Sequence, residues 1–315
     1  MKKAVLLPFF LLKLIMENLI PKISLKNLLS NDINSLEVLS NALKNHGFFI
    51  ITDHNISHEL FKNSYEFSEK FFKLDSSIKN KYSFRENAGA RGYTPFGKET
   101  ALGETVPDLK EFWHHGPVID DSYDSRISEN IIVSEIPGFN DQFDILFNQL
   151  NLLGMKVLSA IAVILGKKPN FFDGWALKGN SILRLIHYPP VEDSSNILRA
   201  RAHEDINLIT LLVGAEESGL EVQNPEGDWI PIAAKSKSIV CNIGDMMQLV
   251  TRSQLKSTSH RVVDNNPGSS ASRYSMPFFL HPSPEVELCS IVDDSTESIS
   301  AHDFLEERLR AIKLY

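Results

Sequence analysis

The second half of the chain is a series of short apolar runs separated by turn residues, and this pattern constrains the fold more than any other feature. The runs read SILRLIHY, INLITLLV, GLEVQ, WIPI, SIVCNI, MMQLVT, HRVV and RYSMPFFL. They are rich in β-branched and aromatic residues, and Asn, Asp, Gly and Pro separate them. Many short strands at even spacing are typical of a β-sandwich or a β-barrel. We therefore predict a β-rich core over residues 181–285.

The rest of the chain reads as longer elements, most of them helical. The pattern predicts strands over residues 20–25 and 48–54, and helices over residues 35–46, 57–74, 140–165 and 301–315. Ser35 is the expected N-cap of the first helix, and Gly47 is expected to end that helix. Around the core, the expected regions are an N-terminal helix and strand region (16–135), a long scaffold helix (136–180) and a C-terminal helical segment (286–315).

Residues 1–15, MKKAVLLPFFLLKLI, imitate a signal peptide, because two lysines precede an apolar run. Pro8 and Lys13 interrupt that run, and no small-residue cleavage site follows it. The stretch Ala4–Leu12 is too short to cross a bilayer. We predict a poorly ordered extension, with Met16 as a plausible start, and keep an export signal as the alternative.

Composition narrows the class of partner. The chain has 315 residues, a net charge of −8 and a pI near 5.7, and phosphate binding would require a basic face. Its only cysteines are Cys241 and Cys289, too few for a secreted disulfide scaffold. We therefore expect a cytoplasmic protein that binds a small molecule, with no nucleic acid and no membrane as partners. The composition does not indicate an oligomeric state.

Three polar residues at the ends of apolar runs suggest a metal site. In ARAHEDINLITLL, His203 and Asp205 are spaced i and i+2, so on a strand they share one face and Glu204 points the other way. His260 begins a later run. Two histidines and one carboxylate form the facial triad of non-haem Fe(II) oxygenases, which leaves coordination positions open for O2 and a chelating cosubstrate. Alternatively, His-x-Asp could be a surface pair and His260 a hydrogen-bonded core residue.

The stretch RYS adds a candidate anion site. Arg273 and Ser275 share one strand face by the same spacing. A guanidinium directed into a barrel beside a metal fits the far carboxylate of a dicarboxylate that chelates the metal, and a hydroxyl adds a third donor. Tyr188, in IHYPP, could donate its phenol to the same anion. The alternative for Arg273 is a structural salt bridge.

Several segments together resemble the isopenicillin N synthase-like family of Fe(II)/2-oxoglutarate-dependent dioxygenases. They are HED, STSHRVV, RYS, NIGD and GLEV…GDWIPI, preceded by IPKISL, NHGFFIITDHNIS and KEFWHHG, and they cover about residues 19–280. The resemblance implies an α+β fold, a double-stranded β-helix (distorted jelly roll) flanked by helices. It also implies iron held by His203, Asp205 and His260. It further implies 2-oxoglutarate held by Arg273, Ser275 and Tyr188.

The resemblance implies a reaction with O2 in which a small molecule is oxidised, by default hydroxylated, with release of succinate and CO2. Desaturation and ring closure are variants. One departure from the family is Ile186-His187-Tyr188, because plant members usually carry Asn-Tyr-Tyr there and Ile186 has no amide. His187 could line the pocket or pack at a strand end. His114 and His115, in a loop-like stretch, are a weak second candidate metal site.

The sequence is also compatible with three other functions. An oxygenase on the same scaffold could work without 2-oxoglutarate and use Arg273 for a substrate carboxylate, as isopenicillin N synthase does. An ethylene-forming type would break down 2-oxoglutarate itself. A non-catalytic small-molecule binding protein is the alternative of another class, although it would have little use for an intact triad. The sequence does not identify the substrate that is oxidised.

Overall fold

The structure is a computed structural model that describes residues 20–83, 90–100, 107–190, 198–213, 219–232, 234, 238–263 and 271–311. The strands are β1 (Lys22–Ser24), β2 (Phe48–Thr52), β3 (Gly92–Thr94), β4 (Glu111–His115), β5 (Ile182–Tyr188), β6 (Leu198–His203), β7 (Ile209–Val213), β8 (Leu220–Gln223), β9 (Trp229–Pro231), β10 (Ile239–Ile243), β11 (His260–Val263), β12 (Arg273–Leu280), β13 (Glu287–Cys289) and β14 (Ser298–Ser300). The α-helices are α2 (Leu25–Leu29), α3 (Ile33–Asn45), α4 (His58–Phe72), α5 (Ser76–Lys79), α6 (Phe139–Ile164), α7 (Asp173–Ala176), α8 (Asp245–Val250) and α9 (Ala301–Ala311). The predicted extension over residues 1–15 lies outside the described residues.

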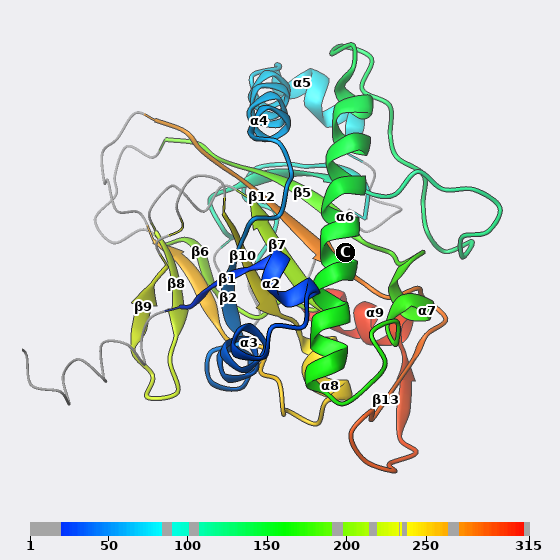
Figure 1. The fold of residues 1–315 in the computed structure, drawn as a ribbon. Coiled ribbons are helices and arrows are strands. Elements are labelled where there is room, and N and C mark those ends of the chain that lie inside the picture. The colour runs from blue at the N-terminus through cyan, green and yellow to red at the C-terminus, as the bar shows by residue number, and fades with distance from the viewer. Residues whose placement is uncertain are drawn as a thin grey trace, which may run out of the picture.

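Two sheets form the centre of the molecule. The larger has the strand order β1-β2-β10-β7-β12-β5-β4-β3, and the smaller has the order β6-β11-β8-β9. All pairs within them are antiparallel except β1 with β2. Helices α3, α4 and α6 lie along one side of the larger sheet (Figure 1). The predicted α+β double-stranded β-helix flanked by helices is therefore confirmed.

Each face of the larger sheet contributes to a separate apolar core. Strand residues such as Phe49, Leu185 and Leu211 pack against the helices, whereas their neighbours Phe48 and Ile186 face the smaller sheet. This alternation follows from the period of two along a strand. On the inner face, polar residues such as Arg273 and Ser275 lie among the apolar ones.

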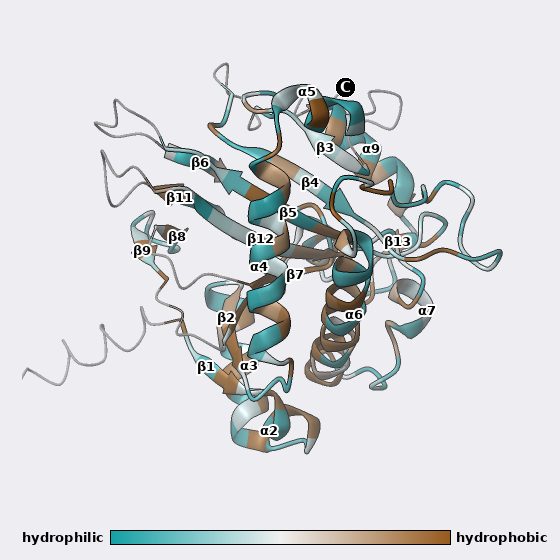
Figure 2. Cartoon of the chain, turned by 90° about the horizontal axis from the view of Figure 1, so that it is seen from above, coloured by the Kyte–Doolittle hydropathy of each residue, from teal (hydrophilic) through white to brown (hydrophobic). Residues whose placement is uncertain are grey.

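Helix α6 is the main support of the outer core. The sequence predicted a helix over residues 140–165, and Gly166, with φ of +70°, follows it closely. By length and composition α6 could cross a membrane, but half of its apolar window is buried within the protein. Its apolar side chains pack on the larger sheet, and Figure 2 colours much of this helix as hydrophobic. We interpret α6 as a core helix.

The structure corrects three predictions about local structure. MMQLVT lies mostly in helix α8 instead of a strand, because Gly244 provides the N-cap and the Met, Gln and Leu side chains, which are not branched at Cβ, are good helix formers. Asp32, not Ser35, is the N-cap of α3, and its carboxylate accepts from the Ser35 amide at 2.8 Å. The loop-like stretch with His114 is strand β4, paired with β5. Gly47 ends α3 as predicted, with φ of +65°.

Candidate metal centre and substrate cavity

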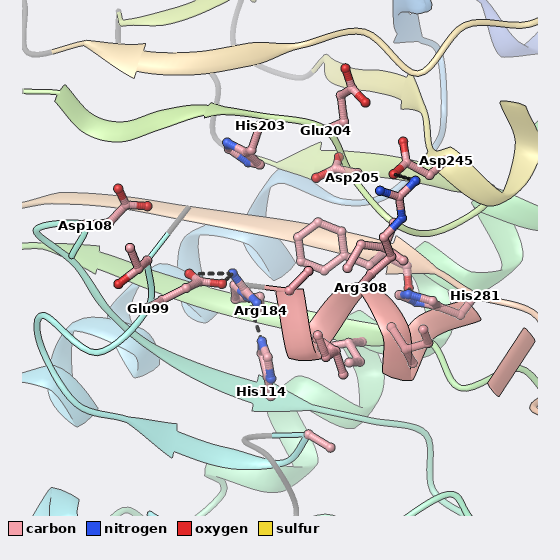
Figure 3. A pocket seen from close by; sticks show the side chains of 18 of the residues that line it. Glu99, Asp108, His114, Arg184, His203, Glu204, Asp205, Asp245, His281 and Arg308 are labelled. Atoms are coloured by element: carbon pink, nitrogen blue, oxygen red, sulfur yellow. Dashed lines mark hydrogen bonds and ion pairs between the residues drawn. The ribbon is translucent and has the colours of Figure 1, made fainter. Parts of the chain in front are cut away.

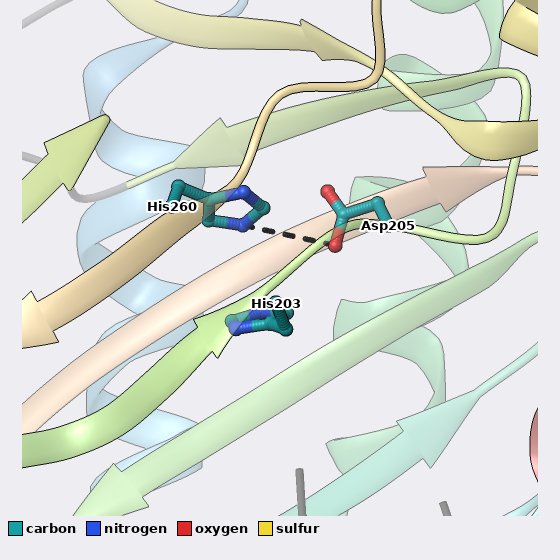
Figure 4. Close-up of side chains that lie close together, drawn as sticks. All are labelled: His203, Asp205 and His260. Atoms are coloured by element: carbon teal, nitrogen blue, oxygen red, sulfur yellow. Dashed lines mark ion pairs between the residues drawn. The ribbon is translucent and has the colours of Figure 1, made fainter. Parts of the chain in front are cut away.

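His203, Asp205 and His260 converge between the two sheets (Figure 4). One ligand atom from each lies within 4.8 Å of the other two. His203 ends β6 and His260 begins β11, and these two residues are paired directly across the strands. Asp205 lies beyond the end of β6, so the predicted common strand for His203 and Asp205 is wrong. The Asp205 carbonyl instead accepts from the Asp245 amide at 2.7 Å, which fixes the connection to β7.

Both histidines are held in the tautomer that a metal requires. The Nδ1 atom of His203 lies 2.7 Å from the Arg201 carbonyl oxygen, and that of His260 lies 3.2 Å from the Thr258 carbonyl oxygen. A carbonyl oxygen only accepts, so Nδ1 carries the proton and Nε2 keeps its lone pair. The Nε2 atom of His260 is 3.8 Å from Asp205 Oδ1. This donor set fits a divalent transition metal, because ligating histidines usually donate their other ring N–H to a carbonyl or carboxylate in this way.

The Asp205 carboxylate is fixed by two hydrogen bonds to the same oxygen. Its Oδ2 atom accepts from Thr210 Oγ1 at 2.6 Å and from Asn242 Nδ2 at 2.7 Å. Thr210 in turn accepts from Asn207 Nδ2 at 2.9 Å. These bonds leave Oδ1 directed towards the histidines. Neither Thr210 nor Asn242 was predicted as a site residue from the sequence, although each is a polar residue inside an apolar run.

Electrostatics keep the candidate ligands in the forms that bind a metal. Burial lowers the pKa of His203 to about 4, and His260 acts in the same direction. Burial raises the pKa of Asp205, but His260, His203 and the hydrogen bonds from Asn242 and Thr210 outweigh it, and the pKa lies below its ordinary value. Metal binding needs neutral imidazole and ionised carboxylate, and near neutral pH His203 and Asp205 have these charges.

The residues predicted to bind 2-oxoglutarate also lie together. Arg273 is paired with Tyr188, and Ser275 with Ile186, across β12 and β5. Residues paired in this way share a face, and Tyr188 and Ile186 belong to the inner core. The guanidinium carbon of Arg273 lies 5.2 Å from the centre of the Tyr188 ring. Arg273, Ser275 and Tyr188 are therefore buried on one inner surface, and their role in cosubstrate binding stays a prediction.

A cavity of about 360 Å³ opens beside the metal centre (Figure 3). His203 and Asp205 line it, whereas Arg273, Ser275 and Tyr188 do not. Its apolar wall includes Phe279 and side chains of α9, and its polar wall carries Arg184 and His114 of β5 and β4. The dimensions suit a small organic molecule.

The other histidines considered from the sequence have separate surroundings. His187 does not line this cavity, and it bonds through Nδ1 to Glu111 at 2.7 Å on the helix-covered face. His114 and His115 point to opposite faces of β4, with His114 beside the cavity and His115 bonded to Asp144. Within the described part of the chain, His203, Asp205 and His260 form the single group with metal-binding geometry.

The chain belongs to the 2OG-Fe(II) oxygenase superfamily, whose profile matches residues 179–282. The profile of the N-terminal region described as "non-haem dioxygenase in morphine synthesis" matches residues 20–133. The resemblance noted from the sequence is thereby confirmed. This protein is an Fe(II)- and 2-oxoglutarate-dependent dioxygenase that uses O2 as its second cosubstrate.

Relatives cover most of the chain. A 2-oxoglutarate-dependent dioxygenase of Didymella fabae is 30% identical over 283 residues, 82% of this chain and 84% of that protein. A 2OG-Fe(II) oxygenase family protein of Caulobacter crescentus has a similar structure, with a TM-score of 0.84, 39% identity and coverage of 93% of this chain and 99% of that one. A full-length protein of Neurospora crassa, crystallised in complex with alpha-KG, has a TM-score of 0.83 at 27% identity, and the match covers 99% of both chains.

Proposed function

We propose that this dioxygenase hydroxylates a small molecule held in the cavity beside His203, Asp205 and His260. One observation carries the proposal, namely that the two imidazoles and the carboxylate converge, and that His203 and Asp205 of this group line a cavity. A facial triad leaves one side of the ion open. A molecule in this cavity would be next to that side. Bound Fe(II) supplies the activation of O2.

The protein's own residues have three tasks in this proposal. His203, Asp205 and His260 hold the ion, and the hydrogen bonds at Nδ1 and Oδ2 keep these ligands oriented before the ion binds. Arg273, Ser275 and the Tyr188 hydroxyl bind the distal carboxylate of 2-oxoglutarate. The cavity walls bring the target carbon close to the ion and exclude bulk water, which limits side reactions.

The relatives support a small-molecule substrate. The Neurospora crassa protein has been crystallised with thymine and with 5-formyluracil, and a relative from Arabidopsis thaliana that is 30% identical is named homoarginine-6-hydroxylase. The acidic pI of about 5.7 supports the absence of a nucleic-acid partner. We further propose a cytoplasmic location, on the basis of the two free cysteines.

The test is anaerobic reconstitution of the protein with Fe(II) and 2-oxoglutarate. We expect the charge-transfer absorption of the chelate and, after admission of O2, release of succinate that a suitable metabolite accelerates. Asp205→Ala should show neither signal. A wild-type protein that binds Fe(II) but no 2-oxoglutarate would contradict the proposal. Ethylene in the headspace would identify the alternative reaction.

A further inference from the structure

Arg184 is held rigidly beside the cavity by three kinds of contact. Its Nε atom donates to His114 Nε2 at 2.6 Å, and Nη1 donates to both Glu99 oxygens at 3.1 and 3.2 Å. Its guanidinium carbon lies 4.2 Å from the centre of the Phe112 ring and 5.3 Å from that of Phe279. The remaining amine, Nη2, forms no hydrogen bond with the described residues. Arg184 therefore offers a fixed donor to a molecule in the cavity.

The charge of Arg184 is partly balanced by a neighbouring carboxylate. Glu99 pairs with both Arg184 and Lys110, and Lys110 pairs with Asp108 at 2.9 Å. These two acids and two bases line one wall of the cavity and are all nearly buried. A donor whose charge is partly neutralised attracts a ligand carboxylate less strongly, but it still forms a good hydrogen bond to a carbonyl oxygen.

The other side of the cavity carries two carboxyl groups, Glu204 and Asp245, and one base, Arg308, among its described residues. Asp245 pairs with Arg308 of α9 at 3.2 Å, whereas Glu204 lines the cavity without an ion pair to any described residue. Figure 3 shows Glu204 and Asp245 above Arg308. A substrate carboxylate would therefore lie close to other carboxyl groups here. These charges therefore disfavour an anionic substrate.

His281 supplies an acceptor in the same cavity. Its side chain is buried, and Nδ1 lies 3.2 Å from the Phe279 carbonyl oxygen. Nδ1 must therefore donate, and burial lowers the pKa of His281 to about 4, so the ring is neutral and Nε2 keeps its lone pair. The two candidate metal ligands show the same arrangement, but His281 is outside their cluster. Its Nε2 atom has no partner among the described residues.

We propose that Arg184 and His281 determine substrate specificity and select an uncharged molecule with an amide or imide group. Arg184 Nη2 donates to the carbonyl oxygen of such a molecule, and an N–H of the substrate donates to His281 Nε2. Both side chains lie below His203 and Asp205 in Figure 3, so a molecule bound to them is directed towards the metal centre. This inference rests on the proposed function, because it concerns the substrate of that same cavity.

The test measures binding of named probes to the anaerobic protein loaded with Fe(II) and 2-oxoglutarate. Nicotinamide, nicotinate and 3-picolylamine share one ring and differ in being uncharged, anionic and cationic, and thymine and uracil add cyclic imides. Ligand-observed NMR gives the affinities, and perturbation of the charge-transfer band reports contact near the iron. We expect an amide or imide to bind at least about tenfold more tightly than either charged probe, because nicotinate has no N–H for His281 and 3-picolylamine has no carbonyl oxygen for Arg184.

Two variants locate the binding. Arg184→Lys keeps the charge facing Glu99 but loses the planar donor edge, and should weaken the best probe about 10- to 100-fold. His281→Phe fills similar space without the acceptor, and should weaken it about 3- to 10-fold. The control is His58→Phe, at the exposed start of α4, which should change nothing. His281→Phe also keeps the test decisive if Arg184→Lys fails to fold.

Several outcomes would overturn the inference. They are tighter binding of nicotinate or 3-picolylamine, no binding of any amide or imide, or unchanged affinity in both variants. In each of these cases the wild type would still bind 2-oxoglutarate and release succinate without substrate, so the proposed function would stand. Loss of 2-oxoglutarate binding by the wild type would instead remove the proposed function itself.

Discussion

The backbone carbonyls of Arg201 and Thr258 fix the tautomer of His203 and His260. Each carbonyl oxygen accepts a hydrogen bond from Nδ1–H, so each Nε2 keeps its lone pair for an ion. This arrangement exists before any ion binds, so little reorganisation is needed on binding. The residue spacing alone could not reveal it, because backbone carbonyls leave no signal in the sequence.

The first prediction concerns the three candidate ligands. His203→Ala and Asp205→Ala should each abolish tight Fe(II) binding while the protein stays folded, because two ligands cannot replace a triad. Glu204→Gln should retain the iron, since Glu204 is outside the cluster. Metal analysis after anaerobic loading, with circular dichroism for the fold, measures both effects. Full iron content in the two alanine variants would show that the ion binds elsewhere.

The second prediction concerns Arg273. Arg273→Lys keeps the positive charge but loses the bidentate fork, so 2-oxoglutarate should bind more weakly by about 2–4 kcal/mol, or roughly 30- to 1,000-fold. Ser275→Ala should cost about 1 kcal/mol, the value of one hydrogen bond. Titration of 2-oxoglutarate into the anaerobic Fe(II) protein measures both, with iron content as the control. An Arg273→Lys variant that binds 2-oxoglutarate as tightly as the wild type would show that this arginine does not bind the cosubstrate.

At the scale of elements, patterns of apolar residues predicted most strands and the long helices correctly. They failed where a short segment has no periodicity, as in MMQLVT, which became α8 after Gly244. They also placed His203 and Asp205 on one strand, whereas the chain leaves β6 at His203 and enters the other sheet at β7. Which sheet a strand joins depends on long-range pairing, and a local pattern does not contain that information.

One polar network joins a helix to the sheet behind the predicted 2-oxoglutarate site. Glu111 of β4 accepts from Lys79 of α5 at 2.8 and 3.0 Å, bonds to His187 of β5 and also accepts from Tyr93. His187 reaches Ser272, the residue before Arg273, through Nε2 at 2.9 Å. The network therefore fixes the start of β12 from the face opposite to Arg273.

The third prediction concerns the stability provided by this network. Glu111→Gln leaves Lys79 buried without its partner, which should lower the free energy of unfolding by about 3–5 kcal/mol at neutral pH. Chemical denaturation measures it. The matched control is Glu66→Gln, in an exposed i,i+4 pair with Lys62, which should cost less than about 0.5 kcal/mol. Equal small effects in both variants would contradict the structural role of the network.

The same network predicts a pH dependence. Burial raises the pKa of Glu111, but the bonds from His187, Lys79 and Tyr93 outweigh it and lower the pKa below its ordinary value of 4.5. A carboxyl with a depressed folded-state pKa stabilises the fold above its unfolded pKa, and this contribution is lost as the pH falls through the folded-state pKa. The difference between wild type and Glu111→Gln should therefore shrink in that acid range. A stability difference that does not change with pH would contradict a lowered pKa of Glu111.

At the scale of the whole molecule, the candidate metal centre connects the two sheets. His203 and His260 belong to the smaller sheet, whereas Asp205 is bonded to Thr210 and Asn242 of the larger one. An ion bound by all three would link the sheets only in the folded state. Ligands that bind only the native state stabilise it according to their concentration relative to Kd.

The fifth prediction follows from this linkage. Anaerobic Fe(II) at about 100 times its Kd should stabilise the protein by roughly 2.7 kcal/mol and raise its Tm in calorimetry. 2-Oxoglutarate should raise the Tm further only when Fe(II) is present, because in the proposed site it would bind both the ion and Arg273. Asp205→Ala should remove both increases, and Arg273→Lys should reduce only the second. A rise with 2-oxoglutarate alone would place that molecule at a site independent of the metal, and an unchanged rise in Asp205→Ala would place the ion outside the two-sheet centre.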